Sequence, residues 1–174
     1  LLQLLALQIG SEVSFAELGT QLGINKVTVE KYINLLEKAF VVFSLRSFAR
    51  NLRKEISKSR KVFFYDLGIR NALINNFNNL DLRNDKGALW ENFCIAERKK
   101  YHSNNRIFSN DYFWRTYTKQ EIDLVEEHDG KLFAYEFKWG NKKAIEPKTW
   151  KQAYQNSEFK LINPINLLDW VTPA

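Results

Sequence analysis

Charged residues on both strands of one predicted hairpin could together bind a metal ion. The Asp-Gly dipeptide at 129–130 lies between two stretches of strand-favouring residues, which is typical of the two-residue loop of a β-hairpin. Counting back from a type I′ turn at this dipeptide places Asp123 directly opposite Glu136 and Glu121 opposite Lys138. Because side chains alternate with a period of two along a strand, these charged side chains share one face.

The chemistry that this group of charges favours is metal-assisted attack on a phosphate. Directly opposed side chains have Cβ atoms about 4.5–5.5 Å apart, and like charges at this distance are destabilising. A divalent cation would relieve the repulsion between Asp123 and Glu136, and Mg²⁺ typically binds one or two protein carboxylates together with water and phosphate oxygens. Lys138 projects towards the same substrate. The alternative is an ordinary solvated hairpin face, on which Glu121 and Lys138 form a surface ion pair of little energetic value.

Composition indicates a packed globular protein that favours anionic partners. Of the 174 residues, 45% are hydrophobic and 14% aromatic, and the net charge is +6, which favours nucleic acid. The single cysteine, Cys94, excludes an internal disulfide and a cysteine-based zinc cluster, and the two histidines indicate no histidine metal site. No run of about 18 apolar residues is present, so we expect no membrane partner and a cytoplasmic location; an oligomer is compatible with the sequence. The chain lacks methionine and begins within a helical pattern, so we expect a fragment of a longer protein.

The first part of the chain has the pattern of a helix-turn-helix protein. Apolar residues recur at helical spacing over 1–9. Ser14 begins a capping box with Glu17 and predicts a second helix, and Asn25 caps a third helix that extends to Phe40. The third helix is the candidate for reading DNA. Its polar residues predicted to contact nucleic acid are Lys26, Thr28 and Lys31.

A basic segment between two strand-like stretches predicts the wing of a winged helix. The stretches 41–45 and 61–65 favour strands, and the acid between them is Glu55 alone. Such a segment would bind phosphates without reading base sequence. Winged helices also serve as protein–protein modules, and a basic run can be merely solvated. The basic residues are Arg46, Arg50, Arg53, Lys54, Lys58, Arg60 and Lys61.

A stretch rich in Asn and Asp separates this part from a second domain. The second part predicts an α/β (α+β) fold in the order αβββαβ, with helices packed on a mixed sheet. Its first helix contains Glu91, its second contains Gln152, and residues 167–170 are predicted as a short packed turn. The predicted boundaries are 1–74 for a winged helix-turn-helix domain, 75–86 for a linker and 87–174 for the second domain.

Within this order, Glu91, Asp123 and the Glu136-Phe137-Lys138 run resemble the PD-(D/E)xK nuclease superfamily, which has a restriction-endonuclease-like fold. The proline of that name is replaced by Ile122. The whole chain also resembles the C-terminal region of prokaryotic AAA-family ATPases. The matching stretches are 62–68, 87–93, 114–116, 121–124 and 136–138.

The resemblance implies that Asp123 and Glu136 bind Mg²⁺, with Glu91 completing or positioning the metal shell. Lys138 would orient the attacking water or stabilise charge on the phosphate. Weaker candidates for the site are Gln152 and Glu121.

The resulting expectation is a DNA-directed C-terminal module of an AAA-type ATPase with a Mg²⁺-dependent, nuclease-like site. ATP would bind to the ATPase domain, which this sequence does not contain. The alternative is a non-catalytic module for nucleic-acid or protein interaction that retains the nuclease fold. A third reading is a winged-helix transcription regulator.

Overall fold

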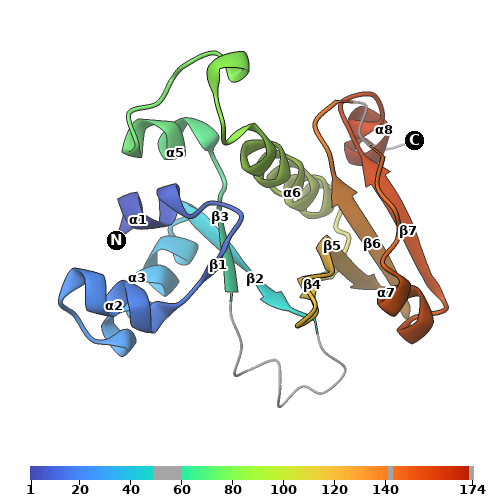
Figure 1. Ribbon diagram of the computed structural model, residues 1–174, viewed down its shortest axis with the longest axis horizontal. Coiled ribbons are helices and arrows are strands. Elements are labelled where there is room, and N and C mark those ends of the chain that lie inside the picture. Colours follow the sequence, from blue (N-terminus) through green and yellow to red (C-terminus); the bar gives the residue numbers. More distant parts are fainter. Residues whose placement is uncertain (49–59, 141–142, 173–174) are drawn as a thin grey trace. The chain divides into compact units, whose positions relative to one another are not determined.

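The computed structural model describes residues 1–48, 60–140 and 143–172, which form two compact units (Figure 1). Unit 1 comprises residues 1–45 and 59–92, and unit 2 comprises residues 46–58 and 93–174. Within the described residues, the strands form a mixed sheet in the order β1-β3-β2-β4-β5-β6-β7. The mixed α/β class predicted from the sequence is confirmed.

Unit 1 is built mainly of helices that pack on short strands. Its core contains Leu5, Leu18, Val29, Ile33 and Phe64, all at most 1% exposed. These residues lie on the apolar faces of successive helices and on one strand, so their burial holds unit 1 together. The elements are α1 Leu2–Leu7, β1 Glu12–Val13, α2 Phe15–Leu22, α3 Lys26–Lys38, β2 Val42–Ser47, β3 Arg60–Phe64, α5 Leu67–Leu73, η1 Leu80–Leu82 and the first part of α6 Lys86–Asn104.

The helix starts in unit 1 follow from side-chain caps that the sequence predicted. The Glu17 N–H donates to Ser14 Oγ at 3.3 Å, and the Thr28 N–H donates to Asn25 Oδ1 at 2.8 Å. Asp66 accepts from the first backbone N–H groups of α5. Each cap satisfies donors that the helix itself leaves unpaired.

The stretch predicted as a linker is held to unit 1 by two buried arginines. Arg83 donates to both carboxylate oxygens of Asp85 at 2.8 Å, and Arg70 bonds the same carboxylate. Arg70 also donates to the Ala6 carbonyl at 2.9 Å, which ties the network to α1. Arg83 lowers the pKa of Asp85 below its usual range, and Arg70 adds to this effect.

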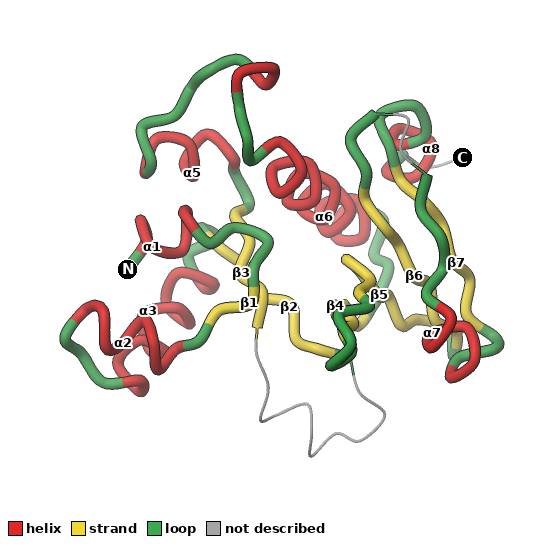
Figure 2. Tube along the Cα trace, viewed as in Figure 1, coloured by secondary structure: helices red, strands yellow, loops and turns green. Residues whose placement is uncertain are grey.

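Unit 2 contains the mixed sheet predicted for the second domain. Strand β4 pairs in parallel with the end of β2, β5 pairs antiparallel with both β4 and β6, and β6 pairs in parallel with β7 (Figure 2). The C-terminal stretch forms a short helix, where the sequence analysis expected a packed turn. The elements are the second part of α6, β4 Asn110–Arg115, β5 Glu121–His128, β6 Lys131–Phe137, α7 Lys148–Ala153, β7 Ser157–Ile162 and α8 Leu167–Val171.

Different side chains cover the two faces of the unit 2 sheet. On one face, Trp150 of α7 packs with Trp114, Val125 and Ala134. On the other face, Trp170 of α8 packs against the rings of β6. The hairpin β5–β6 is therefore covered along much of its length, and this burial changes the behaviour of its charged residues.

Candidate metal and phosphate site

The β5–β6 hairpin has the predicted turn and register. The loop residues Asp129 and Gly130 have φ angles of 53° and 70°, as a type I′ turn requires. His128 lies opposite Lys131, and the pairing continues without a shift to Leu124 opposite Tyr135. Asp123 and Glu136 follow directly beyond this last pair.

A β-bulge marks the position of Asp123 on the other edge of β5. Tyr112 of β4 lies opposite Val125, but Trp114 lies opposite Ile122, so β5 has one residue more than β4 over this span. The extra residue comes at Asp123 and Leu124. Bulges interrupt regular pairing, re-aim side chains and are frequent beside active sites.

The carboxylate of Asp123 accepts a hydrogen bond from the β6 backbone. The Phe137 N–H donates to Asp123 Oδ2 at 2.9 Å, so a side chain satisfies this backbone donor. A carboxylate oxygen has more than one acceptor position. The bond holds Asp123 beside Glu136.

The surroundings of Glu136 disfavour its ionised form. Burial raises the pKa of its carboxyl, and the charge of Asp123 raises it further, with a smaller contribution from Glu121. Lys138 opposes this effect, since its Nζ lies 2.5 Å from Glu136 Oε1. The Lys138 side chain is 35% exposed and that of Glu136 16% exposed. The two acids and the lysine therefore form a half-buried group with excess negative charge.

Chemically, this group suits a hard divalent cation. Carboxylate oxygens are the ligands that Mg²⁺ prefers, and a cation would relieve the repulsion that raises the pKa of Glu136. The predicted acids Asp123 and Glu136 thus lie together with Lys138, and Glu121 lies close enough to act on Glu136 electrostatically.

Glu91 belongs to unit 1, in the first part of α6. It accepts a hydrogen bond at 3.1 Å from Lys61 Nζ. Lys61 is 2% exposed, so it forms a buried ion pair and does not present its charge to solvent. The sequence analysis did not foresee this pair, because it joins residues 30 positions apart on a strand and a helix.

The residues predicted to contact nucleic acid have different surroundings. Lys26, Lys31 and Arg46 are exposed. Thr28 donates its hydroxyl and its N–H to Asn25 Oδ1, as part of the helix cap. Arg60 forms an ion pair with Glu30 at 3.6 Å. Four others, Arg50, Arg53, Lys54 and Lys58, lie outside the described residues.

Gln152 is exposed and lines a pocket of about 390 Å³ in unit 2. The same pocket is lined by Gly130, Lys131 and Leu132. The pocket therefore lies at the turn end of the hairpin, whereas Asp123 lies towards its other end.

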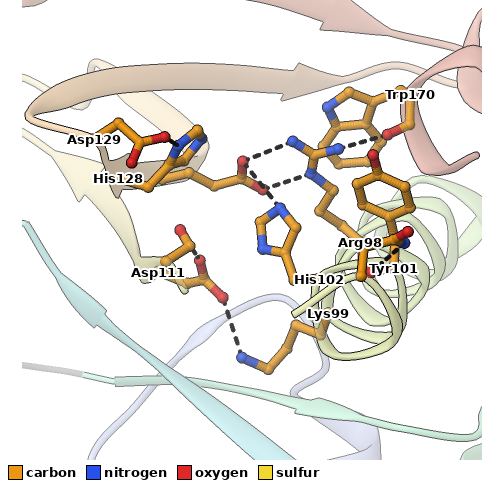
Figure 3. A network of polar contacts seen from close by, with 11 residues as sticks. Arg98, Lys99, Tyr101, His102, Asp111, His128, Asp129 and Trp170 are labelled. Carbon is orange, nitrogen blue, oxygen red and sulfur yellow. Dashed lines mark hydrogen bonds and ion pairs between the residues drawn. The ribbon is translucent and has the colours of Figure 1, made fainter. Parts of the chain in front are cut away.

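A second polar group in unit 2 was missed by the sequence analysis. It joins His102 of α6, Asp111 of β4 and Glu126 of β5, with Arg98 and Lys99 of α6 around them (Figure 3). Glu126 is fully buried. The sequence did contain a signal for it. Glu126 alternates with Ile122 and Leu124, so it lies on the same, covered face of β5.

Comparison with known families adds two matches of unassigned function. Residues 86–165 match a domain of unknown function (DUF4143). Residues 1–80 match another domain of unknown function (DUF8612).

The chain is also similar to two curated mycobacterial proteins. It is 32% identical over 131 residues to the uncharacterized proteins Mb2031c of Mycobacterium bovis and Rv2008c of Mycobacterium tuberculosis. The match covers 74% of this chain and 29% of each relative. No solved structure matches. Among the described residues, no helix is long and apolar enough to cross a membrane.

Proposed function

We propose that unit 2 binds Mg²⁺ at Asp123 and Glu136 and hydrolyses phosphodiester bonds in DNA. The observation that carries the proposal is the half-buried acid pair at the β5 bulge, where burial and the Asp123 charge together raise the pKa of Glu136. Such a pair costs stability unless a cation relieves it. A destabilising pair of like charges beside a β-bulge is typical of a functional site.

Each residue of the group has a distinct role in this proposal. Asp123, held by the Phe137 N–H, supplies a ligand whose position is fixed by the backbone. Glu136 supplies the second carboxylate. A bound Mg²⁺ would polarise a phosphate oxygen and acidify a bound water. Lys138, which contacts Glu136, would then stabilise negative charge on the phosphate or orient the water.

The match to DUF4143 supports a place beside an ATPase, because this domain is found in AAA-ATPase-associated proteins. The chain spans about 29% of the length of the curated relatives. In the proposal, ATP binds to an AAA domain elsewhere in the full-length protein, and unit 2 acts on nucleic acid as its C-terminal module.

Charge in unit 1 supports DNA as the anionic partner. Lys26 and Lys31 are exposed on α3, the predicted reading helix, and the chain has a net charge of +6. The exposed Arg46 lies on β2 in unit 2. Such contacts bind phosphates and make affinity fall with salt concentration without selecting a base sequence.

A second candidate function, a protein-interaction module, is favoured by apolar exposure on α3. Val27 is 61% exposed, Tyr32 52% and Leu35 58%, and Phe40 just after the helix is 72% exposed. A helix that binds DNA through phosphate contacts does not need exposed apolar side chains, whereas a protein partner would cover them. In this alternative the acid pair of unit 2 is retained without catalysis.

A plasmid nicking assay in Mg²⁺ or Mn²⁺ separates the two functions. We expect metal-dependent nicking by the wild type, its loss by at least 100-fold in Asp123→Asn, and retention in Glu127→Gln. Glu127 is the matched control because it is an exposed acid on the same strand. DNA affinity in Asp123→Asn should stay within about threefold of wild type. No metal-dependent nicking by either the chain or its full-length protein would leave the interaction module as the function.

A further inference from the structure

We propose that His102, Asp111 and Glu126 form a second metal site, which binds one first-row transition metal ion of the zinc class. One possible ligand atom from each residue lies within 4.8 Å of the other two. The three residues come from separate elements of unit 2, α6, β4 and β5, so the fold itself brings them together (Figure 3). This site is distinct from Asp123 and Glu136 and does not depend on the function proposed for them.

The imidazole of His102 is buried with an unsatisfied nitrogen. His102 is 5% exposed, and its Nε2 atom has no hydrogen-bond partner. Nε2 lies 3.6 Å from Glu126 Oε2. Buried polar atoms without partners are uncommon, so this one calls for an explanation.

The distance from Nε2 to Glu126 fits a shared metal ion better than a direct hydrogen bond. At 3.6 Å the two atoms are beyond the usual range of about 2.7–3.2 Å for a hydrogen bond from nitrogen. Two ligands at about 2.1 Å from a tetrahedral zinc ion are about 3.4 Å apart. A ligand atom of Asp111 lies within 4.8 Å of the other two, so Asp111 completes the set.

The carboxylates repel each other in the absence of cations. Asp111 and Glu126 are directly opposite on β4 and β5, a position where like charges are destabilising. Arg98 compensates Glu126 through hydrogen bonds of 2.9 and 3.0 Å to its two oxygens and donates to the Trp170 carbonyl at 2.6 Å. Carboxylates that bind a metal are typically also hydrogen-bonded by an outer partner, and Arg98 would be that partner here.

Lys99 neutralises the charge of Asp111, as a bound metal ion would. Its Nζ lies 3.1 Å from Asp111 Oδ2, and its side chain is 29% exposed, so it can swing into solvent. Metal binding then exchanges one mobile positive charge for a divalent ion. Lys99 is therefore a competitor of the metal, and its removal should strengthen binding.

The ligand set selects the class of metal. One imidazole with two carboxylates suits Zn²⁺, Co²⁺ or Ni²⁺ better than Mg²⁺ or Ca²⁺, which take oxygen ligands. Burial, and after it the charge of Arg98, lowers the pKa of His102 to about 4. A neutral imidazole is the form that binds a metal.

The test is titration of the intact chain with Co²⁺, followed by visible absorption, with Zn²⁺ as competitor. We expect one Co²⁺ site that Zn²⁺ displaces, affinity reduced at least 30-fold in His102→Gln and in Asp111→Asn, and affinity raised about tenfold in Lys99→Gln. His128→Gln is the matched control, because its ring lies 6.3 Å from the His102 ring but stacks on Phe133. Asp123→Asn should also retain the Co²⁺ site.

Several outcomes would overturn the proposal. These are no Co²⁺ site in the wild type, unchanged affinity in folded His102→Gln or Asp111→Asn, or equal losses in His128→Gln and His102→Gln. Circular dichroism of each variant establishes folding. If His102→Gln fails to fold, Asp111→Asn and Lys99→Gln decide, and weaker or unchanged binding in Lys99→Gln would then reject the site.

Discussion

Strand β5 contributes one acid to each of two acid pairs, which differ in burial and in how far nearby cations neutralise them. Asp123 of β5 and Glu136 of β6 are partly exposed and are accompanied by Lys138, so these three groups sum to a charge of −1. Glu126 lies opposite Asp111 of β4. Arg98 and Lys99 neutralise this second pair.

The two pairs therefore differ in how they can bind a cation. A pair with excess negative charge attracts a hard cation such as Mg²⁺ from solution, and the cation competes with Lys138 for Glu136. A neutralised, buried pair primarily supports the fold. It binds a metal only if the metal's bond to a ligand such as His102 offsets the free energy lost when Lys99 leaves Asp111. The same strand therefore supplies one site open to a cation and one that discriminates between metals.

The largest effect should come from breaking the buried pair. In Arg98→Met, Glu126 stays fully buried without its bidentate partner, and the hydrogen bond to the Trp170 carbonyl is lost. We expect a loss of about 3–5 kcal/mol in the free energy of unfolding, measured by urea denaturation followed by circular dichroism. A loss below about 1 kcal/mol would mean that Arg98 contributes little to the stability of unit 2.

Asp85 in unit 1 provides a comparison, because its two charged neighbours are arginines that stabilise its ionised form. Arg83 and Arg70 lower its pKa, so the folded state holds the carboxylate ionised where the unfolded state takes up a proton. Its contribution is present above about pH 4 and is lost as the pH falls through the lowered pKa. We expect Asp85→Asn to cost about 1–3 kcal/mol at pH 7 and progressively less as the pH falls below about 4, measured by urea denaturation across pH. A pH-independent cost would contradict this origin.

A smaller effect should follow from removing Lys138. Because Glu136 is less buried than Glu126, Lys138→Met should cost only about 1 kcal/mol in the free energy of unfolding. Thermal melts with and without about 5–10 mM Mg²⁺ test the comparison further. Mg²⁺ should restore most of this loss, but none of the loss in Arg98→Met. Equal responses of both variants would remove the distinction between the pairs.

The smallest effect has the opposite sign. Glu136→Gln relieves the repulsion with Asp123 and should stabilise the metal-free protein by about 0.2–1 kcal/mol. Differential scanning calorimetry in EDTA measures it, with Glu127→Gln as control. Destabilisation by Glu136→Gln would mean that the lost ion pair with Lys138 outweighs the repulsion between the two acids.

Local signals predicted much of this structure. Ser14 and Asn25 begin helices because their side chains cap adjacent N–H groups, and the Asp-Gly turn sets the hairpin register by counting. The Asp123–Glu136 pair follows from that count alone. The sequence also predicted a mixed sheet, since its strands separate cleanly at turn signals.

Contacts between distant segments could not be predicted in the same way. The Asp111–Glu126 pair depends on a β4–β5 register that contains a bulge, so counting from the connecting loop does not find it. The Lys61–Glu91 ion pair depends on how α6 packs in unit 1. Arg83, in a stretch of loop composition, is buried because it shares Asp85 with Arg70.

Calorimetric titration of Mg²⁺ into the wild type and Asp123→Asn tests most directly whether Asp123 and Glu136 together bind a divalent cation. We predict one Mg²⁺ site with a Kd of about 0.1–1 mM in the wild type, lost in Asp123→Asn and retained in Glu127→Gln. Absence of Mg²⁺ binding in the wild type, or equal binding in Asp123→Asn, would contradict the claim and favour the interaction module.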